Sequence, residues 1–344
     1  MVNLFMAFFF ALMISYILTP YAKKLAYKIG AVDVPKDNRR VHTHPIPRMG
    51  GLAIFLAFAI TALITVPIDK SFKGILIGAT MITAIGIIDD VKQISAKYKL
   101  IVQLLAAAVV MYCGIKIEYI HVPILGEWLQ FGKYSYIVTI IWIIGITNAV
   151  NLIDGLDGLA AGVSIIAAVT LGYIAFTHGR QEVAILLFIL AGGSAGFLPY
   201  NFNPAKIFMG DTGALLIGFL LATISIEGVI KSATTIAVAI PVLALGVPVF
   251  DTAFAIVRRL INKRPIMEAD KGHLHHRLIE YGLSQKQTVL VLYFISMVLG
   301  GSAVFISDTS SNTAYLVIVS IGLIVLLGAL RVGLMEKSSR KANG

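Results

Sequence analysis

Long apolar runs recur from one end of this chain to the other, and they limit its folds more than any other feature. Of the 344 residues, 58% are hydrophobic and 13% are charged. A helix needs about 20 apolar residues to cross a bilayer. Since the bilayer core offers the backbone no water, only helices and closed barrels span it. The sequence therefore predicts an all-α polytopic membrane protein that forms a single domain over residues 1–344.

Eleven of these runs are long and apolar enough to count as transmembrane spans. The first is expected to be a retained span and not a signal peptide, because it lacks a basic leading region and a small-residue cleavage site. The eleven predicted spans cover residues 2–19, 50–67, 72–88, 100–115, 136–151, 160–177, 183–199, 212–229, 234–257, 287–306 and 314–330.

The basic residues set the expected orientation. Lys and Arg concentrate on the cytoplasmic side of membrane proteins. With the N-terminus outside and the C-terminus in the cytoplasm, the inner segments hold 22 of the 28 Lys and Arg residues. The net charge of +10 is therefore expected to mark the cytoplasmic loops of a membrane protein and not a nucleic-acid-binding surface. The inner segments of most interest are 20–49, 89–99, 151–160, 200–211 and 258–286.

Two smaller features complete the outline. The outer segment 116–133 alternates apolar and polar residues around Pro123 and Gly126, which predicts a small β-hairpin. Its Trp128 and neighbouring tyrosines fit an aromatic belt at the headgroup level equally well. Cys113 is the single cysteine, so internal disulfides and cysteine-based zinc clusters are excluded.

Six aspartates fall at or near the predicted inner ends of spans. A carboxylate inside a span costs roughly 2.5–3.5 kcal/mol on insertion scales, so such residues usually line a watery cavity or bind a ligand. Helix capping is the simpler explanation for acids at helix starts. We therefore weigh each against capping: Asp89, Asp90, Asp154, Asp157, Asp211 and Asp251.

Capping cannot account for Asp89 and Asp90 in "GIIDDVKQ", since they end a predicted helix, where anions are unfavourable. In "NLIDGLDGLA", Asp157 could cap the next span, but this leaves Asp154 unexplained. An EF-hand is excluded there, because a leucine takes the third ligand position. Asp211 in "FMGDTG" is a plausible cap, and Asp251 could simply pair with Arg258 or Arg259.

Basic and histidine-rich loops surround these acids. His273, His275 and His276 lie within four positions beside Arg277. Zinc is the usual interpretation of such a cluster, but we expect the adjacent His275 and His276 to point different ways on a helix. A cationic phosphate site fits better, and a solvated basic loop is the simpler alternative. The first inner loop adds Arg40, His42 and Arg48.

An acidic, cysteine-free site suits magnesium or manganese. Such an ion neutralises charge that develops on bridging oxygens during phosphoryl transfer, while Lys, Arg and His hold the other phosphates. A position at the bilayer boundary suggests one lipid and one soluble substrate. The residues alone therefore predict a metal-dependent phosphotransferase that acts on a membrane lipid.

Six ordered motifs closely resemble those of the polyprenyl-phosphate N-acetylhexosamine-1-phosphate transferases. The resemblance runs from about residue 20 to residue 285 and implies ten or eleven transmembrane helices. It also implies a Mg²⁺-dependent reaction in which UDP-N-acetylhexosamine and a polyprenyl phosphate give a polyprenyl-diphospho-sugar and UMP. The motifs are "RVHTHPIPRMGG", "GIIDD", "NAVNLIDGLDGLAAG", "FNPAKIFMGDTGALLIG", "VPVFDT" and "DKGHLHHRL".

The resemblance also implies roles for particular residues. Asp211 matches the metal ligand, with Asp154 as a further metal candidate, and Asp89 and Asp90 match a catalytic pair. The nucleotide-sugar side is expected at Asn151, Asp154, Asp157, Asn201 and Phe208, with Gly155 and Gly158 letting the backbone approach the uridine. Phosphate contacts are expected at His273, His275, His276, Arg40, His42 and Arg48.

Local motifs select a branch of the family. "PRMGG" and "HLHHRL" resemble the branch that uses UDP-GlcNAc and undecaprenyl phosphate to start an envelope polymer such as a teichoic acid linkage unit. The phospho-MurNAc-pentapeptide transferases are the nearest alternative. CDP-alcohol phosphatidyltransferases match poorly after the second Asp-Gly. A cation-coupled transporter would place its aspartates near the bilayer midplane. The sequence leaves open whether the protein forms a homodimer. It also leaves open whether the reaction proceeds by direct attack of the lipid phosphate or through a phosphoaspartyl intermediate.

Overall fold

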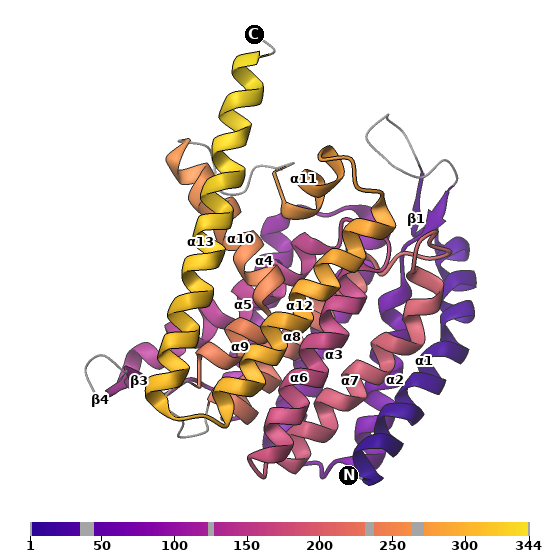
Figure 1. Cartoon of the computed structure of the whole chain (residues 1–344). Helices are drawn as coiled ribbons and strands as arrows, with labels where there is room; N and C mark the ends of the chain where they lie inside the picture. The colour runs from indigo at the N-terminus through magenta and orange to yellow at the C-terminus, as the bar shows by residue number, and fades with distance from the viewer. Residues whose placement is uncertain (1, 35–44, 123–126, 231–236, 263–271, 343–344) are drawn as a thin grey trace.

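A computed structural model shows a bundle of long helices (Figure 1). It describes residues 2–34, 45–122, 127–230, 237–262 and 272–342. Within these residues, seven helices are long and apolar enough to cross a membrane. They are α1 (Val2–Ile29), α3 (Lys70–Lys92), α5 (Ser135–Ile153), α6 (Leu159–Thr177), α7 (Gln181–Asn201), α8 (Gly210–Ser225) and α12 (Gln285–Ser307).

Helices that miss the length or apolarity expected of a span over their described residues occupy the other predicted spans. Every one of the eleven runs contains a helix, so a polytopic membrane protein is confirmed, while the count of eleven spans and their orientation stay predictions. A π-helical turn, Ile226–Ile230, follows α8. The remaining helices are α2 (Gly50–Thr65), α4 (Ala96–Tyr112), α9 (Ala239–Ala244), α10 (Gly246–Ile261), α11 (Leu274–Glu280) and α13 (Ser311–Ala342).

The ninth predicted span, 234–257, is not one continuous helix. The described part breaks at Leu245 between α9 and α10. Pro248 explains the break, because it has no N–H to donate to the carbonyl of Ala244 and its ring would collide with that carbonyl. Two short helices therefore replace one long one, and α10 carries Asp251.

Helix α8 lies at the centre of the bundle. In its most apolar stretch 89% of the residues are buried, against 28% for α1. The first turn of α8 meets glycines of α2 and α3: a Cβ on Gly51 would lie 2.1 Å from Gly213 Cα, and one on Gly86 would lie 2.5 Å from Thr212 Cα. These close contacts fix the start of α8 against two neighbouring helices.

Two small antiparallel sheets accompany the helices. The predicted hairpin within 116–133 is confirmed: β3 (Tyr119–Val122) pairs with β4 (Glu127–Gln130). The side chain of Trp128 lies outside the described residues, so the aromatic belt stays a prediction. The other sheet pairs β1 (Val32–Asp33) with β2 (Ile46–Pro47) and closes the first inner loop. In Figure 1, β1 and α11 lie at the end of the bundle opposite the N-terminus.

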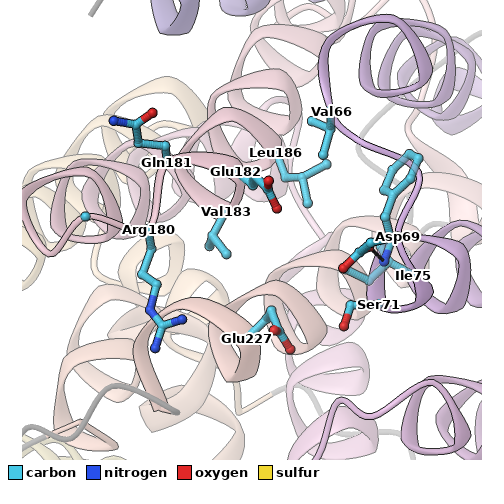
Figure 2. A pocket seen from close by; sticks show the side chains of 12 residues that line it. Val66, Asp69, Ser71, Ile75, Arg180, Gln181, Glu182, Val183, Leu186 and Glu227 are labelled. Carbon is cyan, nitrogen blue, oxygen red and sulfur yellow. Dashed lines mark hydrogen bonds between the residues drawn. The ribbon is translucent and has the colours of Figure 1, made fainter.

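A pocket of about 360 Å³ lies near the start of α3 (Figure 2). Its lining includes Asp69, Arg180, Glu182 and Glu227 above apolar side chains such as Leu186. Helix α3 has 23 residues and so is about 34 Å long. The pocket is therefore far from the aspartates that end α3.

Candidate active site

The end of α3 meets the start of α8 through Asp90. Its Oδ1 accepts a hydrogen bond from the backbone N–H of Asp211 (3.0 Å), and its Oδ2 accepts from the N–H (3.1 Å) and Oγ1 (2.6 Å) of Thr212. The first N–H groups of a helix lack partners within the helix. Asp90, only 5% exposed, therefore caps α8 from another helix.

Gly210 makes this cap feasible. It has φ +70°, and a Cβ there would lie 2.4 Å from Asp90 Oδ2. Any larger residue would push the carboxylate away from the helix start. The glycine before Asp211 in the "FMGD" motif thus serves the contact between α3 and α8.

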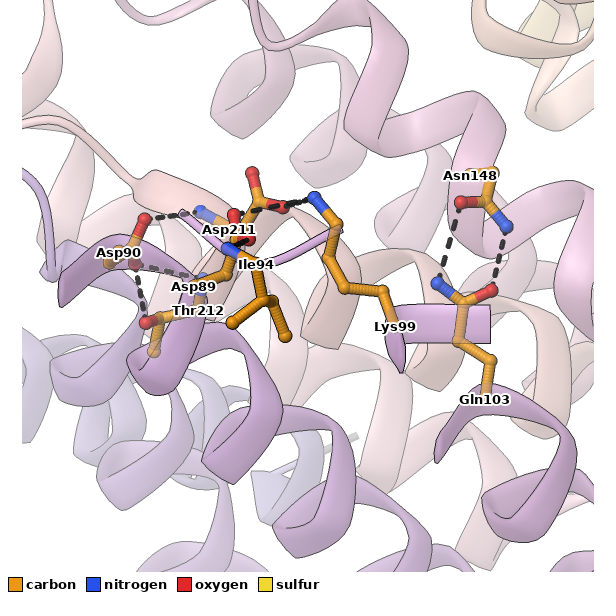
Figure 3. Close-up of polar contacts among 8 residues, drawn as sticks. All are labelled: Asp89, Asp90, Ile94, Lys99, Gln103, Asn148, Asp211 and Thr212. Atoms are coloured by element: carbon orange, nitrogen blue, oxygen red, sulfur yellow. Dashed lines mark hydrogen bonds and ion pairs between the residues drawn. The ribbon is translucent and has the colours of Figure 1, made fainter. Parts of the chain in front are cut away.

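The preceding residue, Asp89, has different surroundings. Lys99 Nζ lies 3.3 Å from Asp89 Oδ2 and 2.6 Å from Asp211 Oδ2 (Figure 3). Asp89 Oδ1 also accepts from the N–H of Ile94 at 3.0 Å. The side chains of Asp89 and Asp211 stay 13% and 18% exposed. The structure thus brings Asp89 and Asp211 together around a cation, while Asp90 is enclosed.

Sequence reasoning missed Lys99. A signal was available: Lys99 follows the start of α4 by three residues, where the helix dipole disfavours cations. A lysine in such a place needs an anionic partner. The partner Asp211 lies 112 positions away in sequence, and spacing alone does not reveal it.

The loop between α5 and α6 brings Asp154 to the same end of the bundle. Burial, together with the negative charges of Asp211 and Asp90, raises the pKa of the Asp154 carboxyl to about 7, while Arg48 opposes them. Asn151, in the last turn of α5, is half-buried beside this loop. The site therefore combines acids from three separate motifs with an arginine from the first loop.

Asp157 holds a neighbouring loop in place. Its Oδ2 accepts hydrogen bonds from Asn203 Nδ2 (3.1 Å) and from the N–H of Ala205 (3.0 Å). The residue that caps α6 is Gly158, with no side-chain hydrogen bond. Capping by Asp157, the simpler explanation considered from the sequence, is therefore wrong.

Asn201 joins the same two loops and is 3% exposed. Its Oδ1 accepts from the N–H of Gly158, and its Nδ2 donates to the carbonyl of Ile207, both at 3.1 Å. Both ends of this amide are thus bonded to backbone. In this structure Asn201 sets the spacing of the loops that carry Asp157 and Phe208.

The glycines of "DGLDG" face protein groups. A Cβ on Gly155 would lie 2.5 Å from His275 Nε2, so this glycine makes room for a histidine. Gly158 has φ +80°, and its carbonyl accepts from the hydroxyl of Tyr293. The neighbours of these glycines in this structure are His275 and Tyr293, and the predicted approach of the uridine to them stays a prediction.

The first histidine of the cluster, His273, contacts Asp251 of α10. His273 Nδ1 lies 2.8 Å from Asp251 Oδ2, and the N–H of Leu274 donates to Asp251 Oδ1 at 2.8 Å. Asp251 and His273 are 8% and 5% exposed. The sequence suggested only arginine partners for Asp251, whereas the structure shows that it anchors the start of α11.

His275 is also buried, and its Nε2 has no hydrogen-bond partner. Burial, together with the neighbouring His276, lowers its pKa to about 4. The rings of His275 and His276 are 4.2 Å apart, so the expected divergence of these two side chains is wrong. In this structure His275 is a neutral imidazole packed against Gly155.

Phe208 connects the metal-ligand motif to the first inner loop. Its N–H donates to the carbonyl of Pro47 (2.8 Å), and its carbonyl accepts from the N–H of Gly50 (3.0 Å). Arg48 lies between Pro47 and Gly50 in the sequence, and its Nη1 is 4.0 Å from Asp33 Oδ1. The remaining first-loop residues of the prediction, Arg40 and His42, lie outside the described residues.

The residues present fit a magnesium ion. Mg²⁺ is usually held by one or two carboxylates together with substrate phosphates, not by a cage of protein ligands. Asp211 and Asp154, whose negative charges act on each other, supply such carboxylates, and the Lys99 ammonium beside Asp211 shows that the position attracts a cation. Among the residues described, no three His, Cys, Asp or Glu side chains gather to hold a metal by themselves.

Comparison with known proteins tests the resemblance. Residues 72–229 match glycosyl transferase family 4, a stretch from α3 through α8 that contains the predicted site residues from Asp89 to Asp211. A Bacillus subtilis (strain 168) protein called "probable undecaprenyl-phosphate N-acetylglucosaminyl 1-phosphate transferase" is 43% identical over 311 residues, which are 90% of this chain and 87% of that protein. This chain belongs to glycosyl transferase family 4.

Two further relatives align over similar lengths. A "decaprenyl-phosphate N-acetylglucosaminephosphotransferase" from Mycobacterium tuberculosis (strain ATCC 25618 / H37Rv) is 34% identical, covering 94% of this chain and 88% of that protein. An "undecaprenyl-phosphate alpha-N-acetylglucosaminyl 1-phosphate transferase" from Salmonella typhi is 27% identical, covering 82% and 78%. The resemblance inferred from the motifs is confirmed, and family 4 membership rules out the transporter and phosphatidyltransferase alternatives.

Proposed function

We propose that this protein transfers GlcNAc-1-phosphate from UDP-GlcNAc to undecaprenyl phosphate, giving undecaprenyl-diphospho-GlcNAc and UMP. The observation that carries the proposal is the carboxylate pair of Asp89 and Asp211, which meet around a cation at the ends of two helices. The names of the family 4 relatives supply the sugar and the lipid.

Different aspartates are assigned to metal binding and to proton removal. Asp211 and Asp154 would hold Mg²⁺, for which Mn²⁺ could substitute. The ion, when bound, neutralises charge on the diphosphate. Asp89 is the better candidate for the base that removes the proton from the lipid phosphate, because Asp90 already accepts three hydrogen bonds from the start of α8.

Direct attack needs the fewest groups. An oxygen of the lipid phosphate forms a bond to the β-phosphorus of UDP-GlcNAc, the bond from that phosphorus to the bridging oxygen breaks, and UMP leaves with the electron pair. The proton of the lipid phosphate passes to Asp89. Positioning and charge neutralisation supply the acceleration, so no covalent enzyme intermediate is required.

The other predicted residues would surround the substrates. Asn151 and Phe208 would face the nucleotide, and Asp157 and Asn201 would hold the loops that carry them. Arg48 and the histidines His273, His275 and His276 would border the phosphates. Arg40 and His42 are assigned to the lipid phosphate by sequence resemblance alone.

The membrane arrangement is part of the proposal. With eleven spans and the N-terminus outside, the site faces the cytoplasm, where UDP-sugars are made, and most Lys and Arg lie on the same side. The product would be the first membrane-bound intermediate of an envelope polymer such as a teichoic acid linkage unit. The assembly is proposed to be a homodimer in the plasma membrane.

Release of UMP tests the reaction. Purified protein in detergent with Mg²⁺, UDP-GlcNAc and undecaprenyl phosphate should release UMP, and omitting the lipid should abolish the release. Equal UMP with and without lipid would refute the transfer. Turnover only with UDP-MurNAc-pentapeptide would move the protein to the sister branch, and one UMP per protein without lipid would indicate a phosphoaspartyl intermediate.

A further inference from the structure

The carboxylates of Asp89 and Asp211 are both in contact with the ammonium group of Lys99. Lys99 Nζ is 2.6 Å from Asp211 and 3.3 Å from Asp89. The three side chains are only 13–21% exposed, so water screens the two negative charges incompletely. The ammonium therefore neutralises much of the repulsion between Asp89 and Asp211 when no other cation is present.

The helix that carries Lys99 is held firmly. One turn further along α4, Gln103 is 2% exposed and pairs with Asn148 of α5 (Figure 3). Asn148 Nδ2 donates to Gln103 Oε1 at 2.7 Å and also to the carbonyl of Ile144 at 2.8 Å. This amide pair joins α4 to α5, so the backbone of Lys99 is fixed while its four-carbon side chain can still turn.

We propose that Lys99 is a resident cation: its ammonium occupies the Asp89–Asp211 pair until a divalent ion binds, and then moves to an oxygen of the bound diphosphate. The inference rests on the proposed function for the identity of the diphosphate. An ammonium 2.6 Å from Asp211 and a metal ion bound to the same oxygen would repel each other. The flexible lysine, and not the fixed carboxylate, is the group that yields.

Binding of Mn²⁺ to the purified protein, followed by electron paramagnetic resonance without nucleotide or lipid, tests this inference. Lys99→Met should bind Mn²⁺ about tenfold more tightly than the unchanged protein, because a neighbouring charge shifts such equilibria by one unit or more. Lys97→Met is the matched control: Lys97 is exposed two residues earlier on α4 and should leave the affinity unchanged. Equal or weaker binding by Lys99→Met would overturn the proposal.

A second variant identifies the ion's position. In protein that carries Asp211→Asn, adding Lys99→Met should no longer tighten Mn²⁺ binding. A gain that persists would show that the ion binds elsewhere and would also overturn the proposal. Lys99→Gln should repeat the result of Lys99→Met if the methionine variant fails to fold.

Thermal unfolding gives an independent readout. In EDTA, Lys99→Met should melt below the unchanged protein because its two carboxylates have lost their counterion, and Mn²⁺ should raise its melting temperature more than that of the unchanged protein. The reverse order would contradict a resident cation. UMP release by the unchanged protein is scored separately, so a failed activity with tightened Mn²⁺ binding would refute only the proposed function.

Discussion

The carboxylate region around Asp89 and Asp211 differs from the histidine region around Asp251 in what holds its acids. Asp89 and Asp211 share a flexible lysine and stay partly exposed. Asp251 is buried and accepts from His273 and from the backbone of Leu274. A mobile counterion can be exchanged for a ligand, whereas fixed N–H donors cannot. The first region is thus suited to chemistry and the second to supporting it.

Asp89 and Asp90 are neighbours in the chain, yet they are held in different ways. Asp90 resembles Asp251, because it is buried and its oxygens accept hydrogen bonds from the start of a helix. Adjacent acids in a motif therefore need not share a role. Substitutions should separate these two kinds of acid.

The largest effect is expected at Asp211. Asp211→Asn should lower UMP release at least about 10³-fold, since it removes charge from the metal-binding pair. The protein should still fold, because its cap from Asp90 uses the backbone of residue 211. Asp308→Asn, at the far end of α12, is the control and should keep full turnover. Near-normal turnover by Asp211→Asn would remove this residue from the site.

A smaller effect is expected in the histidine region. Gly155→Ala would place a methyl group 2.5 Å from His275 Nε2 and should displace the ring. Turnover should fall about 10–100-fold, as is typical when supporting contacts are lost. His275→Ala in the same protein should relieve the collision, so the double variant should be no worse than His275→Ala alone. Strictly multiplicative losses would argue against the contact.

Much of the fold follows from the sequence. The apolar runs predict helices at the observed places because a membrane span needs little beyond length and apolarity. The position of the break at Leu245 could not be predicted, because the run stays apolar through Pro248. Position along the chain also predicted that acids from several motifs would meet, since their loops lie at the same end of alternating spans.

Individual roles at the site were harder to predict. The division between Asp89 and Asp90 depends on residues more than 110 positions away, including Asp211 and Thr212. The same holds for His275 and Gly155, which approach each other from separate loops. Sequence spacing identifies which residue types are present, while tertiary contacts decide which atoms remain available to a ligand.

The smallest effect concerns stability and pH at Asp154. Its folded pKa is raised from 3.8 to about 7. For a raised acid, the stability is full below pH 3.8, falls as the pH rises to about 7, and stays low above that. Without divalent ions, Asp154→Asn should therefore melt higher than the unchanged protein at pH 8, and the difference should shrink steadily toward pH 4. A lower melting temperature at pH 8 would contradict the assigned environment.

The division between Asp89 and Asp90 is the central claim, and thermal melting of Asp89→Asn and Asp90→Asn beside their UMP release tests it most directly. Asp90→Asn should lose about 1–3 kcal/mol of stability, because its new amide group faces donors at the start of α8. Asp89→Asn should abolish turnover and melt close to the unchanged protein. Equal melting temperatures for the two variants, or near-normal turnover by Asp89→Asn, would contradict the account.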